Sequence, residues 1–382
     1  MYDDVYDDTL SEADMLAMCL GMSDTVLETS ALGQDIVTLS HHLWRQDLIE
    51  IDRQLKELAR VEALLNSDRL ILPDSYGSDV VVLAPDALLE TLTTIYTVLV
   101  TMFHETDIGQ HYRPSPYATS FLWAFSSCAY LREAGFYQPP TMSRQVAEQT
   151  VLELNQRLMA WHQFLKEPAF ARECYRSRRN SRNNYQSLRK LIDALFKRYG
   201  RLTVLRVDLS YSKMDGPYID YETARYHREQ LCETFHRHEL FVHLLGYAWK
   251  LEWKPQKGFH YHFLFFFHGH HVQEDVPHAK RIGELWVHSI TGSQGVYRNC
   301  NKNAENVYHY NALGCIDYHD FEKQRGLEYI ARYLTKIDEY AEMLVTGRKF
   351  QTSAMRDVPE GPRPGRPRLF PAYRSFGDVD FP

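Results

Sequence analysis

The chain has 382 residues, 44% of them hydrophobic and 24% charged, which is ordinary for a soluble globular protein of two or three domains. Its six cysteines contain no CxxC pair, and this pattern argues against a zinc knuckle and against a disulfide framework. No basic and apolar leader opens the chain, and the longest nearly uncharged stretch, 91–103, is too short to span a bilayer. We therefore expect a cytoplasmic protein without a membrane partner.

The formal net charge of −7 conceals an asymmetry between two parts of the chain. Residues 1–170 carry 25 acidic and 10 basic residues, whereas residues 171–382 carry 25 acidic and 33 basic residues. An acidic first part and a basic second part indicate that only the second part meets nucleic acid.

The first 170 residues show mostly helical patterns. Apolar residues recur at roughly helical spacing from Ile36 to Leu65, and Ser143 is suited to cap a helix that runs to Leu165. We predict an acidic, mostly helical N-terminal domain over residues 1–170, whose role the sequence does not indicate. Residues 171–184 hold five arginines and form a predicted junction, which is either a solvated linker or an arm that contacts phosphates.

From residue 185 onward, helical and strand patterns alternate. A helical stripe up to Tyr199 precedes a strand over 202–211, and a helix is predicted from Asp220 to about Leu240. Two further strands, 244–254 and 259–267, are joined by a turn at 255–258 and should form an antiparallel hairpin.

The later part of the chain continues the alternation. A helix is predicted over 275–290, a short strand near 312–318, and a helix from Asp320 to about Met343. We expect an α+β fold in which a central antiparallel sheet with helices occupies residues 185–346. A Pro-, Gly- and Arg-rich C-terminal arm over 347–382 follows it.

The segment GFHYHFLFFF, 258–267, contains the strongest candidate site. Residues two apart on a strand point to the same face, so His260 and His262 present two imidazoles in parallel. The hairpin places Glu252 on the neighbouring strand, across from the histidines, whereas Asp208 is an outside candidate on a different strand. Two imidazoles and one carboxylate leave open positions on a Mg²⁺ or Mn²⁺ ion, and they also suit Zn²⁺.

The predicted late helix carries a second chemical pattern. Tyr329, Tyr333 and Lys336 stand at i, i+4 and i+7 and therefore share one helix face. Two phenols one turn apart offer two nucleophiles to one phosphate, if a nearby cation or metal compensates for their weak acidity. The same pattern also fits an amphipathic helix that buries two aromatic rings.

Other histidines have weaker patterns. His236 and His238 fall in a predicted helix, where residues two apart diverge, so we do not assign them to a metal. His268, His270 and His271 follow the histidine strand in a glycine-containing turn. They form either a second ion site or a solvated hairpin end.

The order of these motifs resembles the HUH endonuclease superfamily of rolling-circle replication initiators. Within it, the two-tyrosine spacing is similar to the branch typified by small single-stranded DNA phages. The chain resembles most closely the prophage-encoded, inovirus-type replication-protein family, also known as the YagK/YfjJ C-terminal domain family. The residues that carry the resemblance lie between about 184 and 348: LRVDLSY, GYAWKLEWKPQKGFHYHFLFFF, GELW and YIARYLTK.

The resemblance implies a ferredoxin-like, split βαβ palm as the sheet domain. It implies that His260 and His262 bind the metal, that Tyr333 and Tyr329 are the nucleophiles, and that Lys336 orients the phosphate or a metal-bound water. Glu252 as third ligand is our inference from the hairpin geometry.

The family reaction is a site-specific nick of one DNA strand that leaves a 5′-phosphotyrosine and a free 3′-OH to prime synthesis. The implied partner is single-stranded DNA at a replication origin. Because the sequence has no GxxxxGK[ST] motif, we expect a separate host helicase. Two alternatives stay open: a relaxase or transposase of the same superfamily, and a non-enzymatic, metal-stabilised DNA-binding regulator with the tyrosines in its core.

Overall fold

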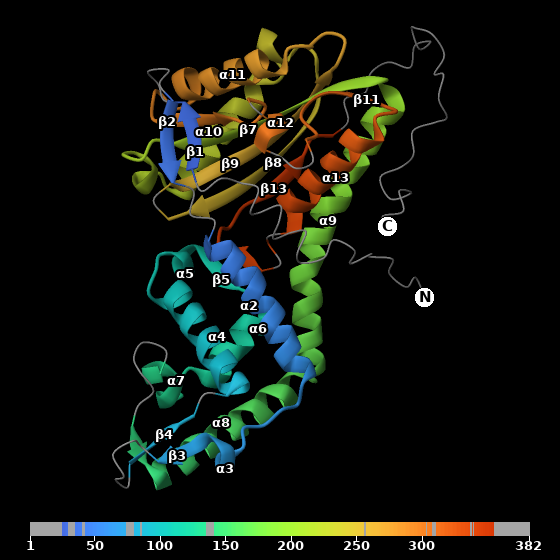
Figure 1. Ribbon diagram of the computed structural model, residues 1–382. Coiled ribbons are helices and arrows are strands. Elements are labelled where there is room, and N and C mark those ends of the chain that lie inside the picture. Colours follow the sequence, from blue (N-terminus) through green and yellow to red (C-terminus); the bar gives the residue numbers. More distant parts are fainter. Residues whose placement is uncertain are drawn as a thin grey trace. The chain divides into compact units, whose positions relative to one another are not determined.

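The structure is a computed structural model, shown in Figure 1. It describes residues 25–29, 35–39, 43–73, 80–84, 86–134, 141–255, 257–302, 304–307, 311–336, 338 and 340–354. These residues fall into two compact units. The helical unit comprises Leu43–Asn180 and Asp338–Leu344, and the sheet unit comprises Ser181–Ile337 together with the strands before and after these ranges.

The helical unit consists of short and long helices with two small sheets. Its helices are α2 (Leu43–Arg60), α3 (Ser67–Leu70), α4 (Ala87–His104), α5 (Ile108–His111), α6 (Pro116–Phe125), α7 (Ala129–Ala134), α8 (Arg144–Leu165) and the first part of α9 (Pro168–Arg198). One sheet pairs β3 (Ile71–Pro73), β4 (Val80–Leu83) and β6 (Met142–Ser143), and the other pairs β5 (Tyr112–Pro114) with β12 (Ala341–Met343).

Side-chain caps explain where two of these helices begin. The Ser143 side chain accepts a hydrogen bond from the backbone N–H of Val146 at the start of α8, as the sequence predicts. Asp86 caps α4 in the same way. By length and composition alone α4 is apolar enough to cross a membrane, although we expected its uncharged stretch to be too short. It packs in the helical unit and buries residues such as Leu92 and Leu99, as the core helix of a bundle does.

The sheet unit is built on an eight-stranded antiparallel sheet. Its strands are β1 (Thr25–Thr29), β2 (Asp35–Leu39), β7 (Arg201–Tyr211), β8 (Leu244–Lys254), β9 (Gly258–His268), β10 (Gly295–Asn299), β11 (Gly314–Asp317) and β13 (Phe350–Thr352). Seven strands follow the order β13-β8-β9-β7-β10-β1-β2, and β11 pairs with β7 beyond the end of β10.

The centre of this sheet has a simple connectivity. Helix α10 (Tyr221–Thr234) links β7 to β8, and helix α11 (Asp275–Leu285) with the π-helical turn η3 (Trp286–Ile290) links β9 to β10. The run β7-α10-β8-β9-α11-β10 therefore forms a β-α-β-β-α-β unit whose strands lie in the order β8-β9-β7-β10. The hairpin β8–β9 has the predicted antiparallel register.

The two faces of the sheet differ in chemistry. On one face Tyr211, Tyr261 and Phe263 pack against α10 and η3, through residues such as Phe235 and Trp286. The opposite face is apolar at one end, where Gly246 of β8 meets Leu191 of α9, and becomes polar towards the other end.

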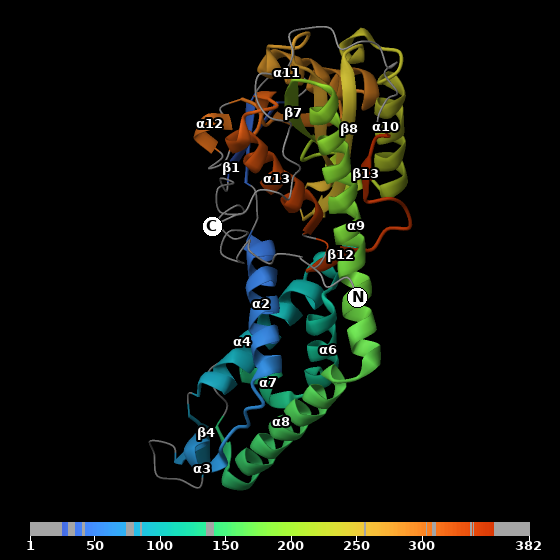
Figure 2. The ribbon, with the colours of Figure 1, turned by 90° about the vertical axis from the view of Figure 1, so that its right-hand side faces the viewer.

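Helix α13 (Phe321–Lys336) lies beside the second part of α9, as Figure 2 shows. The Ser181 hydroxyl donates to the backbone oxygen of Thr335, and the Tyr185 hydroxyl donates to the Glu328 carboxylate. Helix α13 thus packs on α9 and carries the predicted tyrosines.

Several predicted elements differ from the structure. Ile36 and Leu39 belong to strand β2, not to a helix, so the segment before Leu43 adds strands to the sheet instead of helices to the first domain. β-branched residues in both short segments favour this conformation. The predicted helix to Met343 ends at Lys336, because the backbone of Ala341–Met343 pairs with β5.

Two further differences concern strands of this sheet. Strand β10, which follows the predicted helix 275–290, was not predicted from the sequence pattern. The predicted C-terminal arm begins with strand β13, which pairs with β8, and its residues from 355 onward lie outside the described residues. The arginine-rich residues 171–184 form part of helix α9.

Candidate metal centre and tyrosine helix

The polar end of the sheet face brings Glu252, His260 and His262 together. The register places Glu252 directly opposite His260, as predicted from the hairpin. Glu252 Oε2 lies 3.2 Å from His260 Nε2 and 2.8 Å from His262 Nε2. The three ligand atoms all lie within 4.8 Å of one another, and all three residues are buried, so this group can hold a metal ion.

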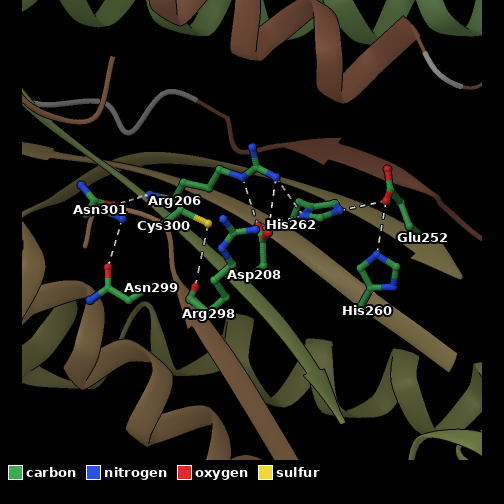
Figure 3. Close-up of polar contacts among 9 residues, drawn as sticks. All are labelled: Arg206, Asp208, Glu252, His260, His262, Arg298, Asn299, Cys300 and Asn301. Carbon is green, nitrogen blue, oxygen red and sulfur yellow. Dashed lines mark hydrogen bonds and ion pairs between the residues drawn. The ribbon is translucent and has the colours of Figure 1, made fainter. Parts of the chain in front are cut away.

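The histidine rings are held by contacts at their other nitrogen. His260 Nδ1 lies 3.4 Å from the backbone oxygen of Gly258, and His262 Nδ1 lies 2.7 Å from Asp208 Oδ1. A proton on each Nδ1 satisfies these oxygens and leaves each Nε2 lone pair directed towards the shared point. Figure 3 shows both rings turned towards Glu252 in this way.

Asp208 was an outside candidate for the metal, and the structure places it beside His262. The two residues are register partners on β7 and β9. Because its carboxylate contacts Nδ1 instead of the point between the Nε2 atoms, Asp208 orients His262 and is not one of the three converging ligands.

Burial and nearby charges shift the pKa values of His260 and Asp208. Burial lowers the pKa of His260 to about 3, and Lys254 acts in the same direction, so the imidazole is neutral at physiological pH. Burial alone raises the pKa of Asp208, but Arg206, His262 and Arg298 together hold it well below its ordinary value. A neutral imidazole and an ionised carboxylate are the forms that a metal site requires.

Four cationic side chains share this face with the cluster. A cross-strand row runs from Arg298 through Asp208 and His262 to Lys250, because each is the register partner of the next. Arg206, two residues from Asp208 on β7, and Lys254, two residues from Glu252 on β8, lie on the same face, and both are buried. Such a concentration of positive charge favours the approach of a phosphate group.

Gly258 is required by the backbone at the start of β9. Its φ of +68° is a conformation that side chains rarely adopt, and a Cβ there would lie 2.3 Å from the Gly216 oxygen. The glycine lets the chain turn tightly into β9 and leaves its own oxygen free to accept from His260.

Both predicted tyrosines lie on α13, one turn apart. Tyr329 and Tyr333 are 7% and 9% exposed. The Arg206 guanidinium carbon lies 5.6 Å from the ring centroid of Tyr333, and Arg206 also contacts Asp208 and His262. Tyr333 and His262 therefore share one neighbour, the Arg206 guanidinium. Lys336 is the last residue of α13, and its side chain lies outside the described residues.

The other histidines form separate groups. His236 and His238 lie in the turn after α10, not in a helix, and His238 Nδ1 accepts from the backbone N–H of Leu240. At the far end of β9 the rings of His243 and His271 stack with centroids 4.1 Å apart. An open groove of about 900 Å³ in this region is lined by six histidines: His238, His243, His270, His271, His278 and His288. Within the described residues, no three of them converge as Glu252, His260 and His262 do.

Sequence reasoning assigned no role to three residues of this network. Arg206 lies within the predicted strand 202–211, and Arg298 and Asn301 lie where no strand was predicted. The available signal was the polar alternation of Arg206 and Asp208 within an otherwise apolar strand. Their link to His262 depends on β7 lying next to β9, which is a property of the sheet order.

Part of the chain matches a known family model. Residues 166–341 match the model of the YagK/YfjJ C-terminal domain, so this segment carries that domain and includes all the predicted site residues. No curated protein and no solved structure was found to match the chain.

Proposed function

We propose that this chain, which carries a YagK/YfjJ C-terminal domain, is an HUH-type endonuclease and ligase that nicks single-stranded DNA to initiate rolling-circle replication of a phage or mobile element. The observation that carries the proposal is the buried Glu252, His260 and His262 cluster with Tyr333 beside it. A divalent-metal site and a tyrosine on a neighbouring helix are the two parts that a metal-assisted phosphodiester transfer needs.

Glu252, His260 and His262 would hold Mg²⁺ or Mn²⁺, with Asp208 orienting His262. The bound ion would polarise the scissile phosphate and stabilise the charge that develops on it. Arg298, Lys250 and Lys254 lie on the same sheet face, where positive charge attracts the phosphates of the strand.

In the transfer the phenol oxygen of a tyrosine attacks phosphorus, and the bond from phosphorus to the 3′ oxygen breaks. The products are a 5′-phosphotyrosine and a 3′-OH, and the proton lost by the phenol balances the one gained by the 3′ oxygen. The ester keeps the energy of the broken bond, so the reverse reaction joins DNA ends. A second tyrosine one turn away can cut the regenerated origin while the first holds the 5′ end. Lys336, three residues after Tyr333, is assigned to orient the phosphate.

The substrate we propose is single-stranded DNA at the element's own replication origin, in the cytoplasm, with a host helicase to unwind the duplex. A mobilisation relaxase or a transposase would use the same chemistry on a different DNA. The origin sequence separates these cases, because each enzyme acts on the DNA of its own element.

One observation favours a second function. Both tyrosine rings are buried, so DNA reaches the phenols only after the surrounding residues move. Core tyrosines are what a metal-stabilised, non-enzymatic DNA-binding regulator would have. Such a regulator binds duplex DNA and forms no covalent adduct.

The two functions are separated by a gel assay for covalent adducts between the protein and single-stranded origin DNA in the presence of Mn²⁺. We expect adducts with the parent protein and none with Tyr329→Phe/Tyr333→Phe or His260→Ala. Tyr226→Phe is the matched control, because Tyr226 is an exposed tyrosine on α10. Adducts that persist in the double tyrosine variant would refute the nucleophile assignment. Duplex binding without adducts in the parent would support the regulator.

A further inference from the structure

At Arg206, strand β7 is paired with neither β10 nor β11, and the Asn301 side chain bonds to its backbone instead. Strand β10 pairs with β7 from Tyr211 to Val207, and β11 pairs with β7 from Val204 to Arg201. Between them, Asn301 Oδ1 accepts from the backbone N–H of Arg206 at 3.0 Å, and Asn301 Nδ2 donates to the Val204 oxygen at 3.0 Å. The two hydrogen bonds of the Asn301 amide thus satisfy backbone groups of β7 that neither neighbouring strand pairs with, and they hold the backbone at Arg206 in place.

Residues 299–301 make further hydrogen bonds that hold Asn301 and the Arg206 backbone in place. Cys300 donates its backbone N–H to the Arg206 oxygen at 3.1 Å, and Asn299 Oδ1 accepts the backbone N–H of Asn301. Asn301 Nδ2 also donates to Asp275 of α11 at 2.8 Å. Figure 3 shows this network on one side of Arg206 and the metal-binding cluster on the other.

The Arg206 guanidinium is buried and directed at the metal centre. Nε and Nη2 lie 3.1 Å and 3.3 Å from the two Asp208 oxygens, a forked ion pair with an arginine that is 2% exposed. Nη2 is also 3.2 Å from His262 Nδ1. Because the Asp208 oxygen lies closer to Nδ1, at 2.7 Å, we assign the Nδ1 proton to the Asp208 contact and treat the arginine as a neighbouring cation.

Each tyrosine of α13 has a guanidinium near its ring, but the two guanidiniums differ in origin. Arg325, whose carbon lies 5.9 Å from the Tyr329 centroid, is on the same helix and moves with that tyrosine. Arg206, at 5.6 Å from the Tyr333 centroid, is on β7 and is fixed to the metal centre. The Arg206 contact therefore links the Tyr333 ring to a side chain that also contacts Asp208 and His262.

We propose that Arg206 is a positioning residue that holds Tyr333 against the metal centre and so makes Tyr333, not Tyr329, the first tyrosine to attack DNA. This inference rests on the proposed function and adds to it the order of the two nucleophiles. In the first step the Tyr333 oxygen bonds to phosphorus, the bond from phosphorus to the 3′ oxygen breaks, and the proton of the phenol passes to the departing 3′ oxygen to give the 3′-OH. Tyr329 serves the second cut.

The test follows each tyrosine alone, in Tyr329→Phe and Tyr333→Phe proteins, with single-turnover adduct formation on origin DNA at saturating Mn²⁺. We expect the protein that retains Tyr333 to react at least about tenfold faster than the one that retains Tyr329, since small displacements from attack geometry cost large factors in rate. Arg206→Gln should remove most of this difference, and Arg206→Lys, which keeps the buried charge, should restore part of it. Arg325→Gln is the matched control and should leave the Tyr333 rate within about twofold.

A spectroscopic readout separates positioning from loss of metal. With 3-fluorotyrosine at position 333, the fluorine resonance should shift in Arg206→Gln and stay in place in Arg325→Gln, with or without Mn²⁺. If adducts form in the parent but both tyrosines slow equally in Arg206→Gln, or if Arg206→Gln keeps the full preference for Tyr333, the inference about Arg206 fails and the proposed function stands. If the parent forms no adduct, both the inference about Arg206 and the proposed nicking function fail. If Arg206→Gln does not fold, an Arg206→Lys protein with no preference for Tyr333 overturns the inference.

Discussion

The two ends of strand β9 both carry histidines, yet they differ in every property that matters for metal binding. At the first end His260 and His262 are buried and converge on one carboxylate oxygen. At the other end His270 and His271 are exposed, and their ring contacts are with other histidines, such as His268. The far end has more histidines than the first end, so density alone does not make a site.

The difference lies in what the neighbouring strands supply. Glu252 from β8 and Asp208 from β7 each face a histidine across a fixed register, and the strand pairing holds the donors in place. The histidines at the far end lie in or beside a turn and present rings to solvent and to each other. A metal needs several oriented ligands at once, and among the described residues the sheet interior provides them at Glu252, His260 and His262.

The largest expected effect tests this comparison directly. His260→Ala should lower affinity for Mn²⁺ at least about 100-fold, because it removes one of three ligands, whereas His270→Ala should leave it within about twofold. Isothermal titration calorimetry on the full chain measures both and should give one tight ion per chain. An equal loss of Mn²⁺ affinity in the two variants would mean that the histidine-rich turn takes part in the metal site.

A smaller effect is expected when the ligand stays but its orientation is lost. Asp208→Asn should weaken Mn²⁺ binding by about 10–100-fold, because the amide no longer fixes the His262 proton on Nδ1. The same titration measures it, with Asp215→Asn in the neighbouring loop as control. An unchanged affinity in Asp208→Asn would show that packing alone orients His262.

The smallest effect concerns acid stability of the metal-free protein. The pKa of His260 falls from 6.5 to about 3 on folding, mainly through burial, so below pH 6.5 the unfolded chain binds a proton that the folded chain does not. This stability is fully present above pH 6.5 and is lost as pH falls from 6.5 towards 3. Urea unfolding in EDTA between pH 8 and pH 4 should therefore show a shallower pH dependence for His260→Asn than for the parent.

The matched variant for this titration is at the other end of the strand. His270→Asn should keep the pH dependence of the parent, because that side chain is exposed. If both substitutions reduce the pH dependence of the free energy of unfolding equally, burial of His260 is not the cause of the acid sensitivity.

Much of the sheet domain was predictable because its local patterns agree with its fold. The strand patterns of β7, β8 and β9, the hairpin turn and the caps at Ser143 and Asp320 are visible in short stretches of sequence. Strands β1, β2, β10 and β13 were missed because they are short and gain their stability from pairing with distant partners.

The sequence by itself determined that His260 and His262 share a face, because a strand alternates with period two, and that Glu252 faces them across a tight hairpin. It also determined that Tyr329 and Tyr333 share a helix face, because a helix repeats every 3.6 residues. Only the tertiary structure decided that Asp208 orients His262 and that Arg206 lies between the metal centre and Tyr333. These contacts join β7, β9 and α13, and their partners are set by strand order and helix packing, which local periodicity does not encode.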